Sequence, residues 1–310
     1  MESKVTVIIC AYSLERVTDT QDAVQSVLAQ TMQPIEVIVS VDNNEGVYER
    51  LRDELPDNVN VILNSSIQGL SETRNAGIRA SSGDIVAFID DDAVAEPDWL
   101  ENLISPFNDP RVMAVGGESI PVWPGGKTPS WFPAEFDWTI GCTAHMKLML
   151  LENGSVRNVT GSNMAFRSEV FQKIGFWETS LGAINGKSRG GEEANICLRI
   201  KAGIEGSLII YEPKAVVHHR IAPARATLWH LFRYCRDEGF NRAKMRKATA
   251  RFIEKPLSAE LTFLRHLLTS SILGRLRRFY RLSNLAQIAA ITASLVFMGT
   301  TFILGRVIFR

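Results

Sequence analysis

Along the first hundred residues, short apolar runs alternate with segments whose apolar positions recur every three or four residues. The runs are rich in Val and Ile, as is typical of strands covered on both faces. They lie at 4–10, 36–42, 59–63 and 84–90. The segments between them have the spacing of amphipathic helices. They lie at 20–30, 46–55 and 71–81. This alternation predicts an α/β fold with a doubly wound, mostly parallel sheet.

The regularity weakens after about residue 100. Residues 121–138, PVWPGGKTPSWFPAEFDW, mix prolines with aromatic side chains, and we expect a long surface loop there. The remaining pattern predicts three strands, two helices and a glycine-rich loop before about residue 220. These are strands at 158–166, 207–212 and 215–220, helices at 168–174 and 192–202, and the loop at 182–191.

A different pattern appears near the C-terminus. The 20 residues from Leu285 to Leu304 carry no charge, and as a helix they would rise about 30 Å, enough to cross a bilayer core. Several arginines precede them. We therefore predict a single transmembrane anchor at 284–305, and a buried core helix is the alternative. The excess of arginine before the anchor predicts that the domain preceding it lies on the cytoplasmic face.

Charge is divided unevenly along the chain, although the formal net charge is zero. Residues 1–224 hold 18 Lys and Arg against 30 Asp and Glu, whereas residues 225–281 hold 14 against 4. The basic segment has helical spacing, with an apolar face that includes Leu257, Leu261 and Leu264, and this combination is typical of a helix lying on anionic membrane lipids. Nucleic-acid binding is an alternative for the basic charge, but no interleaved aromatic platform accompanies it, so we expect no nucleic-acid partner.

Two further features bear on location. The four cysteines, Cys10, Cys142, Cys197 and Cys235, show no CxxC spacing, and we expect reduced thiols in a reducing compartment. The N-terminal stretch MESKVTVIICAYS has neither a basic n-region nor a long apolar h-region, and it predicts a first strand instead of a signal peptide.

Three consecutive carboxylates, Asp90, Asp91 and Asp92, directly follow the strand at 84–90. In parallel sheets, ligands bind beyond the carboxyl ends of the strands. Alternation along an extended chain puts Asp90 and Asp92 on one side and Asp91 on the other. Such a cluster suits Mg²⁺ or Mn²⁺, although a solvated acidic turn with a helix-capping role for Asp92 is the alternative. No GxxxxGK[ST] and no strand-linked GxGxxG occurs, so a phosphate ligand would depend on the metal.

Several ordered motifs resemble the family 2 glycosyltransferases, which have the Rossmann-like GT-A fold. IICAYSLERVTDTQDAVQSVLAQTMQPIEVIVSVDNN resembles their first strand, turn, helix and acidic second strand, and GLSETRNAGIRASSGDIVAFIDDDAVAEPDWLE resembles their segment before and including the DXD motif. The likeness continues through GSNMAFRSEVFQKIGFWE and GGEEANICLRI and covers most of residues 4–225.

The resemblance implies a site for a nucleotide sugar. It implies that Asp42 and the backbone near Ala11 and Tyr12 hold the uracil or ribose, and that Arg74 contacts base or phosphate. It assigns the outer positions of DXD to Asp90 and Asp92, with Asp92 as direct metal ligand, and a ribose contact to Asp91. One departure concerns base recognition, because family members often have two acidic residues where this chain has Val41 and Asp42.

The resemblance also implies roles around the transferred sugar. Glu193 occupies the place of the catalytic base, and Glu192 competes for this role, although two glutamates in a first turn are also what helix-start electrostatics favour. The helix N-terminus predicts that the base stays ionised at neutral pH, available but weak. Gly161 and Asn163 match the floor beneath the sugar, while a buried Asn also ties down turns. His219 matches a late metal or diphosphate ligand, and a structural histidine is the alternative.

These observations predict a GT-A domain at 1–225, with a nucleotide-binding half at 1–100 and an acceptor half at 101–225, then a basic amphipathic segment at 226–283 before the anchor. The implied function is a metal-dependent, inverting hexosyltransferase that uses Mn²⁺ or Mg²⁺. It would move a sugar from a nucleoside diphosphate donor, expected to be UDP-linked, to a lipid-linked glycan acceptor. The alternative is a non-catalytic, membrane-attached protein that binds nucleotide sugars or polysaccharides. A sugar nucleotidyltransferase is disfavoured because its GGxGTR opening is missing.

Overall fold

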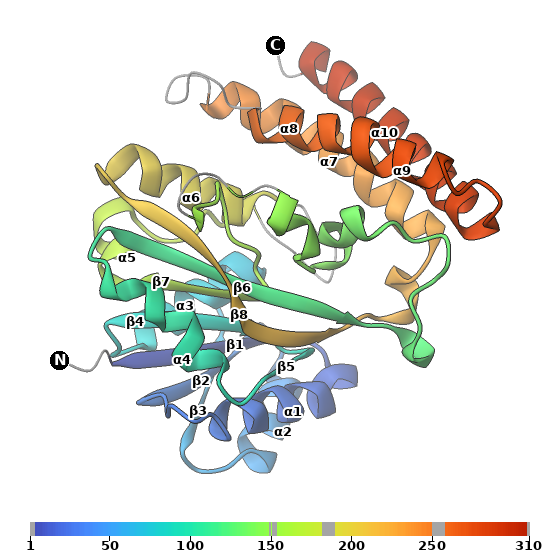
Figure 1. The fold of residues 1–310 in the computed structure, drawn as a ribbon. Coiled ribbons are helices and arrows are strands. Elements are labelled where there is room, and N and C mark those ends of the chain that lie inside the picture. Colours follow the sequence, from blue (N-terminus) through green and yellow to red (C-terminus); the bar gives the residue numbers. More distant parts are fainter. Residues whose placement is uncertain (1–3, 149, 151–153, 182–189, 250–257, 309–310) are drawn as a thin grey trace. The chain divides into compact units, whose positions relative to one another are not determined.

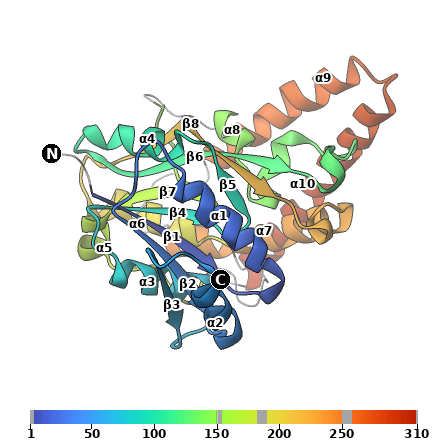
Figure 2. The same ribbon diagram turned by 90° about the horizontal axis from the view of Figure 1, so that it is seen from below.

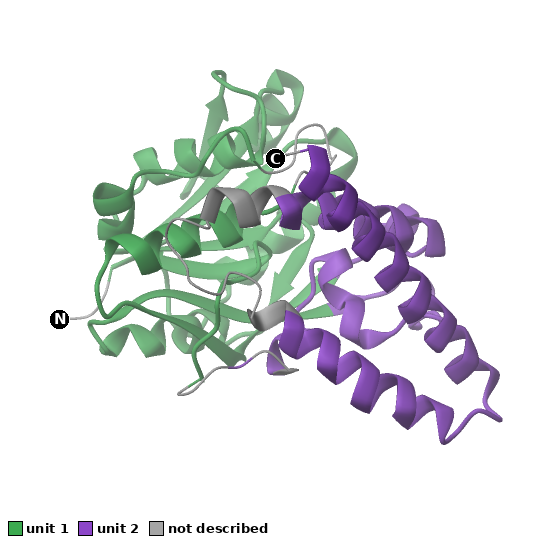
Figure 3. Cartoon of the chain, turned by 90° about the horizontal axis from the view of Figure 1, so that it is seen from above, with its two compact units in different colours: residues 1–120, 151–219 green, residues 121–150, 220–310 purple. Residues whose placement is uncertain are grey.

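The computed structural model describes residues 4–148, 150, 154–181, 190–249 and 258–308. The chain forms two compact units, coloured separately in Figure 3. We call residues 1–120 and 151–219 the sheet unit, and residues 121–150 and 220–310 the helical unit.

The sheet unit is built on one mixed sheet of eight strands in the order β3-β2-β1-β4-β7-β6-β8-β5 (Figures 1 and 2). The first four in this order are mutually parallel, and β7 joins β4 in antiparallel orientation. The predicted doubly wound, mostly parallel sheet is confirmed for its N-terminal half. The strands are β1 (Val5–Ala11), β2 (Glu36–Asp42), β3 (Val59–Asn64), β4 (Ile85–Asp90), β5 (Ala93–Ala95), β6 (Val112–Val122), β7 (Asn163–Arg167) and β8 (Leu208–Arg220).

Helices cover both faces of this sheet. They are α1 (Val17–Leu28), α2 (Glu45–Glu54), α3 (Leu70–Ala80), α4 (Trp99–Ile104), α5 (Ser168–Ile174) and α6 (Glu192–Gly203). Alternate residues of β1 point to opposite faces: Val7 and Ile9 join the core that includes Val24 of α1, whereas Ile8 meets α3. A Cβ at Gly77 of α3 would lie 2.7 Å from Ile8 Cγ2, so this helix packs closely because it has a glycine there.

Two predictions for the middle of the chain were wrong. The sequence pattern did not predict β5 or β6, and the strands predicted at 207–212 and 215–220 form the single strand β8. Residues 121–138 form a surface loop only in part: residues 124–128 are exposed, whereas Trp123, Phe132 and Phe136 are almost completely buried. Proline and glycine content predicted a loop, but the aromatic side chains pack into the core of the helical unit.

The helical unit combines that segment with C-terminal helices. Its short 3₁₀ helices are Pro124–Gly126, Ala134–Ile140, Ala144–Leu148 and Pro223–Arg225. The longer elements are α7 (Leu228–Thr249), α8 (Ser258–His266), a π-helical turn (Leu267–Ile272), α9 (Leu273–Leu276) and α10 (Leu282–Ile308). Phe136 packs in one cluster with Leu231 of α7, Phe263 of α8 and Ile291 of α10.

α7 and α10 approach closely through small residues. A Cβ at Gly305 would lie 2.8 Å from that of Ala243, and one at Gly239 would collide with Thr301. The Thr301 hydroxyl donates to the Arg236 carbonyl at 2.8 Å and so satisfies a polar group inside this contact.

Among the described residues, α10 alone is long and apolar enough to span a membrane. Its most apolar stretch of 18 residues has a mean hydropathy of 1.9, and 28% of that stretch is buried inside the protein. A core helix of a soluble domain would be mostly buried, so the low burial favours the predicted anchor over the alternative of a core helix.

Candidate active site

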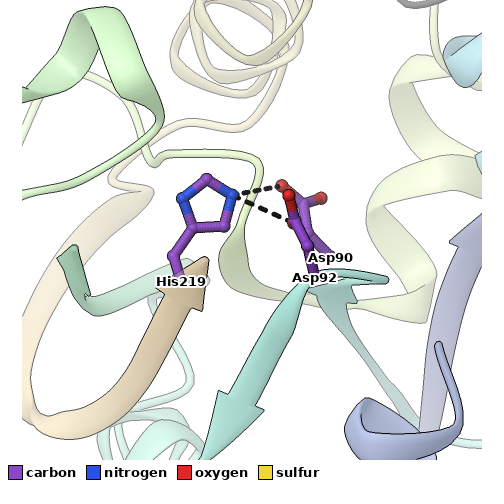
Figure 4. A group of neighbouring side chains, drawn as sticks. All are labelled: Asp90, Asp92 and His219. Atoms are coloured by element: carbon purple, nitrogen blue, oxygen red, sulfur yellow. Dashed lines mark ion pairs between the residues drawn. The ribbon is translucent and has the colours of Figure 1, made fainter. Parts of the chain in front are cut away.

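Two carboxylates of the acidic run, Asp90 and Asp92, meet a histidine from a distant part of the sequence, His219, at the end of β4. β5 pairs with β8 in antiparallel orientation and sets Ala93 opposite His219, which brings this histidine beside the acidic run. His219 Nε2 lies 3.1 Å from Asp92 Oδ1 and 3.7 Å from Asp90 Oδ2 (Figure 4). The neighbouring His218 points away and pairs with Glu96 at 2.6 Å, so only one of the two histidines faces the cluster.

This group has the composition of a metal site. One potential ligand atom from each of Asp90, Asp92 and His219 lies within 4.8 Å of the others. Two carboxylate oxygens and one imidazole nitrogen are donors that divalent cations accept in proteins. His219 and Asp92 are buried, and the side chain of Asp90 is 33% exposed. The residues present therefore fit a divalent cation, and the cluster is accessible on the side of Asp90.

Arg16, which no sequence motif indicated, supplies a positive charge beside the acidic run. Its guanidinium donates to Asp91 Oδ1 at 2.7 Å and also pairs with Asp92, and it lies over the Tyr12 ring, 5.5 Å from the centroid. Burial raises the pKa of Asp91 to about 7, and Arg16 opposes this shift only in part. Three adjacent carboxylates require a nearby cation, but nothing in their spacing identifies Arg16 as its source.

A second acidic pair begins α6. Arg74 Nη1 lies 3.5 Å from Glu193 Oε1 and 3.9 Å from Glu192 Oε1. The buried guanidinium of Arg74 also stacks over Trp177, 4.9 Å from the ring centroid. A Cβ at Gly161 would collide with both Glu193 and Arg74. The fold therefore brings four of the predicted site residues together, and a side chain at position 161 would displace the ends of the Glu193 and Arg74 side chains.

The ionisation predicted for Glu193 was wrong. The sequence predicts that the helix N-terminus keeps this carboxylate charged at neutral pH. Burial, together with the neighbouring charge of Glu192, instead raises the pKa of Glu193 to about 8, and Arg74 opposes this shift only in part. Loss of water around the side chain outweighs the field of one helix end.

The remaining predicted residues lie at the ends of β1, β2 and β7. Asp42 is buried, and its Oδ1 accepts a 2.9 Å hydrogen bond from the backbone N–H of Gly69. Gly69 precedes α3 with φ of 136°, a conformation that favours glycine. Ala11 is buried at the end of β1, whereas the Tyr12 side chain is 38% exposed. The carboxyl ends of parallel β1, β2 and β4 thus carry Ala11, Asp42 and Asp90 along one edge of the sheet.

Asn163 serves the framework behind the site. Its amide donates to the carbonyls of Glu118 at 3.0 Å and Ala215 at 2.8 Å, and its oxygen accepts from Trp99 Nε1 at 2.8 Å. These three bonds link β7 to β6, β8 and α4, which matches the alternative of a buried, structural asparagine. The glycine-rich loop predicted at 182–191 lies outside the described residues except for Gly190 and Gly191.

Comparison with known proteins agrees with this geometry. The family model for glycosyl transferase family 2 matches residues 6–175. The glucosyl-dolichyl phosphate glucuronosyltransferase of Haloferax volcanii is 35% identical over 303 residues, which cover 95% of this chain and 92% of that protein. The succinoglycan biosynthesis protein ExoM of Rhizobium meliloti is 25% identical, with 71% of this chain and 68% of that protein covered.

Solved structures show the same fold. The mannosyltransferase PcManGT of Pyrobaculum calidifontis, in complex with GDP-Man and Mn²⁺, superposes with a TM-score of 0.60 over 99% of this chain and 87% of that one, at 18% identity. GalNAc-T7 with UDP, GalNAc and Mn²⁺ gives a TM-score of 0.52 over 70% and 43%, also at 18% identity. The strand order, the acidic strand end and the family match lead to one conclusion: the chain belongs to the family 2 glycosyltransferases and has their GT-A fold.

Proposed function

We propose that the protein is an inverting, metal-dependent glycosyltransferase that moves a sugar from a nucleoside diphosphate to a lipid-linked glycan acceptor at a membrane. The observation that carries this proposal is that the sheet unit contains both acidic groups that such a reaction needs. One is the cluster of Asp90, Asp92 and His219, and the other is the pair Glu192 and Glu193 beside Arg74. The acceptor class is supported by the dolichyl phosphate-linked substrate in the name of the Haloferax relative. We expect a UDP-linked donor.

The nucleotide would lie along the edge formed by β1, β2 and β4. The backbone at Ala11 and Tyr12 and the carboxylate of Asp42 would contact base and ribose. Asp91, a neighbour of both Arg16 and the metal cluster, would reach the ribose. Arg74 carries a positive charge in a buried position, and it would orient a diphosphate oxygen or the base.

Asp92, Asp90 and His219 would hold the divalent cation. When bound there, a cation neutralises the diphosphate of the donor and stabilises the departing nucleotide. The nitrogen ligand supplied by His219 favours Mn²⁺ over Mg²⁺, which prefers oxygen. Arg16 holds Asp91 and Asp92 in place from the side opposite His219.

Glu193 is the proposed general base. Its carboxylate would take the proton of the acceptor hydroxyl while the acceptor oxygen bonds to the anomeric carbon and the bond to the diphosphate oxygen breaks. Attack from the face opposite the leaving group inverts the configuration. A pKa raised to about 8 makes the ionised form a stronger base than an exposed glutamate. Glu192, with a side chain only 6% exposed against 19% for Glu193, is less accessible to the acceptor.

The helical unit would place the enzyme at the membrane. We propose that α10 spans the bilayer and that the basic segment before it lies on anionic headgroups, with the sheet unit on the cytoplasmic side. Exposed Leu261, Leu264 and Leu268 on α8 and the following turn provide the apolar contacts of that segment. Leu257 lies outside the described residues.

Radiolabelled sugar transfer tests the proposal. Membranes containing the full chain are supplied with labelled UDP-glucuronic acid, UDP-glucose or GDP-mannose and with extracted polyprenyl phosphate glycolipids, in Mn²⁺ or in EDTA. Label should enter the lipid fraction from a UDP-linked donor and only with the cation present. UDP binding without transfer from any donor would support the non-catalytic alternative, and transfer that persists in EDTA would exclude the metal role.

A further inference from the structure

The helical unit contains a polar cavity of about 580 Å³ between the π-helical turn, α9 and the start of α10. Side chains from all three elements line it, together with one acidic residue of the segment at 121–138. The charged and amide side chains among them are Glu135, Arg275, Arg277, Arg278, Asn284 and Gln287. The cavity thus combines three guanidinium groups with one carboxylate immediately before the apolar helix.

The carboxylate neutralises one of these arginines. Arg275 forms a two-bonded ion pair with Glu135, at 2.7 and 2.9 Å, and its Nε also donates to Gln287 at 2.7 Å. Arg277 and Arg278 are exposed and form no ion pair with any other residue that the structure describes. Two positive charges therefore remain at the cavity, on planar groups that suit phosphate oxygens.

Exposed apolar side chains alternate along the chain with the residues that line the cavity, and we call them the apolar rim. Six large side chains around the end of α9 and the start of α10 are between 43% and 82% exposed, and they are Leu273, Leu276, Phe279, Tyr280, Leu282 and Leu285. A basic cavity with several exposed apolar side chains near it is complementary to a ligand that has an anionic head and an apolar tail. A soluble phosphate would make no use of this rim.

We propose that this cavity binds the phosphate group of a membrane lipid through Arg277 and Arg278, with the lipid tail against the apolar rim. The ligand class is a phosphomonoester or phosphodiester carried on a lipid, which includes an isoprenoid phosphate and an anionic phospholipid. The inference rests on the membrane placement of α10 proposed above, but it does not depend on sugar transfer.

Calorimetric titration of the full chain in neutral detergent micelles tests the inference without any sugar donor. The probes are farnesyl phosphate, dihexanoylphosphatidylglycerol and, as the phosphate-free control, farnesol. The test variant is Arg277→Gln/Arg278→Gln. The matched control is Arg265→Gln/Arg281→Gln, which removes two exposed arginines of the same segment that do not line the cavity.

The test variant should lose affinity for the phosphate probes by about tenfold or more, because each lost charge-assisted contact weakens binding. The control variant should stay within about threefold of the wild type, and Arg277→Lys/Arg278→Lys should retain most of the affinity. Preference for farnesyl phosphate would assign the site to an isoprenoid lipid, and preference for phosphatidylglycerol to a phospholipid. Equal losses in both double-glutamine variants, or farnesol binding as tight as farnesyl phosphate, would overturn the inference. Because no donor is present, failure of sugar transfer would leave these results intact.

Discussion

The acidic sites of the sheet unit and the arginine-lined cavity of the helical unit differ in how they hold their charged side chains. In the sheet unit, Asp92 lies buried between Arg16 and His219, and Arg74 is buried against the glutamates of α6. In the helical unit, Arg275 is paired with Glu135, whereas Arg277, Arg278 and Arg281 are exposed. Buried charges cost desolvation free energy and persist only at positions where partners hold them. Under the proposed function, the sheet unit fixes its charges for chemistry, and the exposed arginines of the helical unit present their charge to a membrane surface.

The largest effect should come from Asp92→Asn. This change removes a carboxylate shared by the metal cluster and Arg16, and transfer should fall about a thousandfold or more. Initial rates with saturating donor measure it. Asp109→Asn is the matched control, because Asp109 forms an exposed ion pair with Arg111 at 2.6 Å. Loss of this exposed pair should leave the transfer rate almost unchanged. A variant at position 92 that keeps a tenth of the wild-type rate would contradict its role.

Glu193→Gln should lower the transfer rate by about 10²- to 10⁴-fold, the range typical of a lost general base. Donor binding should be unchanged, as measured by UDP titration. Glu192→Gln is the control within the same helical turn, and it should lower the transfer rate clearly less than Glu193→Gln does. The reverse order of the two effects would assign the base to Glu192 instead.

The pH dependence of transfer follows from the raised pKa of Glu193, about 8. Below this value the carboxylate is mostly protonated and cannot accept a proton, so kcat/KM should rise about tenfold per pH unit from pH 6 and level off near pH 8. The residual rate of Glu193→Gln should lack this rise. A wild-type profile that is already flat at pH 6 would rule out the proposed ionisation.

Gly161→Ala should reduce transfer by about tenfold and destabilise the fold by about 1–3 kcal/mol, because the new Cβ collides with Glu193 and Arg74. Thermal unfolding and initial rates report the two effects. Gly46→Ala, where the added Cβ meets nothing closer than 3.6 Å, should change neither. Equal transfer rates and equal unfolding temperatures of the two alanine variants would show that Glu193 and Arg74 can move without loss of function.

The smallest effect should come from an exposed charge of the helical unit. Arg265→Gln removes one positive charge without a buried partner, and transfer to a short-chain acceptor in detergent should stay within about twofold of wild type. A tenfold loss in this assay would mean that the exposed arginines take part in the chemistry, and the distinction between the two units would fail.

Local patterns in the sequence predicted much of the sheet unit. Val and Ile runs identify β1 to β4, because strands covered on both faces need continuous apolar residues over a short stretch. The acidic run was recognised from its place at the end of a strand, and Gly161 was implied by the resemblance to the family.

Features that depend on distant parts of the chain escaped prediction. Arg16 reaches Asp91 and Asp92 only through the packing of its own segment against the end of β4. The aromatic residues around Phe136 become buried only when α7, α8 and α10 cover them. The ionisation of Glu193 is set by burial, which one sequence does not report.

The central claim is that Asp90, Asp92 and His219 hold a cation through which the nucleotide diphosphate is bound. Calorimetric titration of the full chain with UDP, in Mn²⁺ and in EDTA, tests it most directly. The account predicts clear UDP binding in Mn²⁺, binding at least about tenfold weaker in EDTA, and no dependence on the cation in Asp92→Asn. UDP affinity that is the same with and without the cation in the wild-type protein would contradict it.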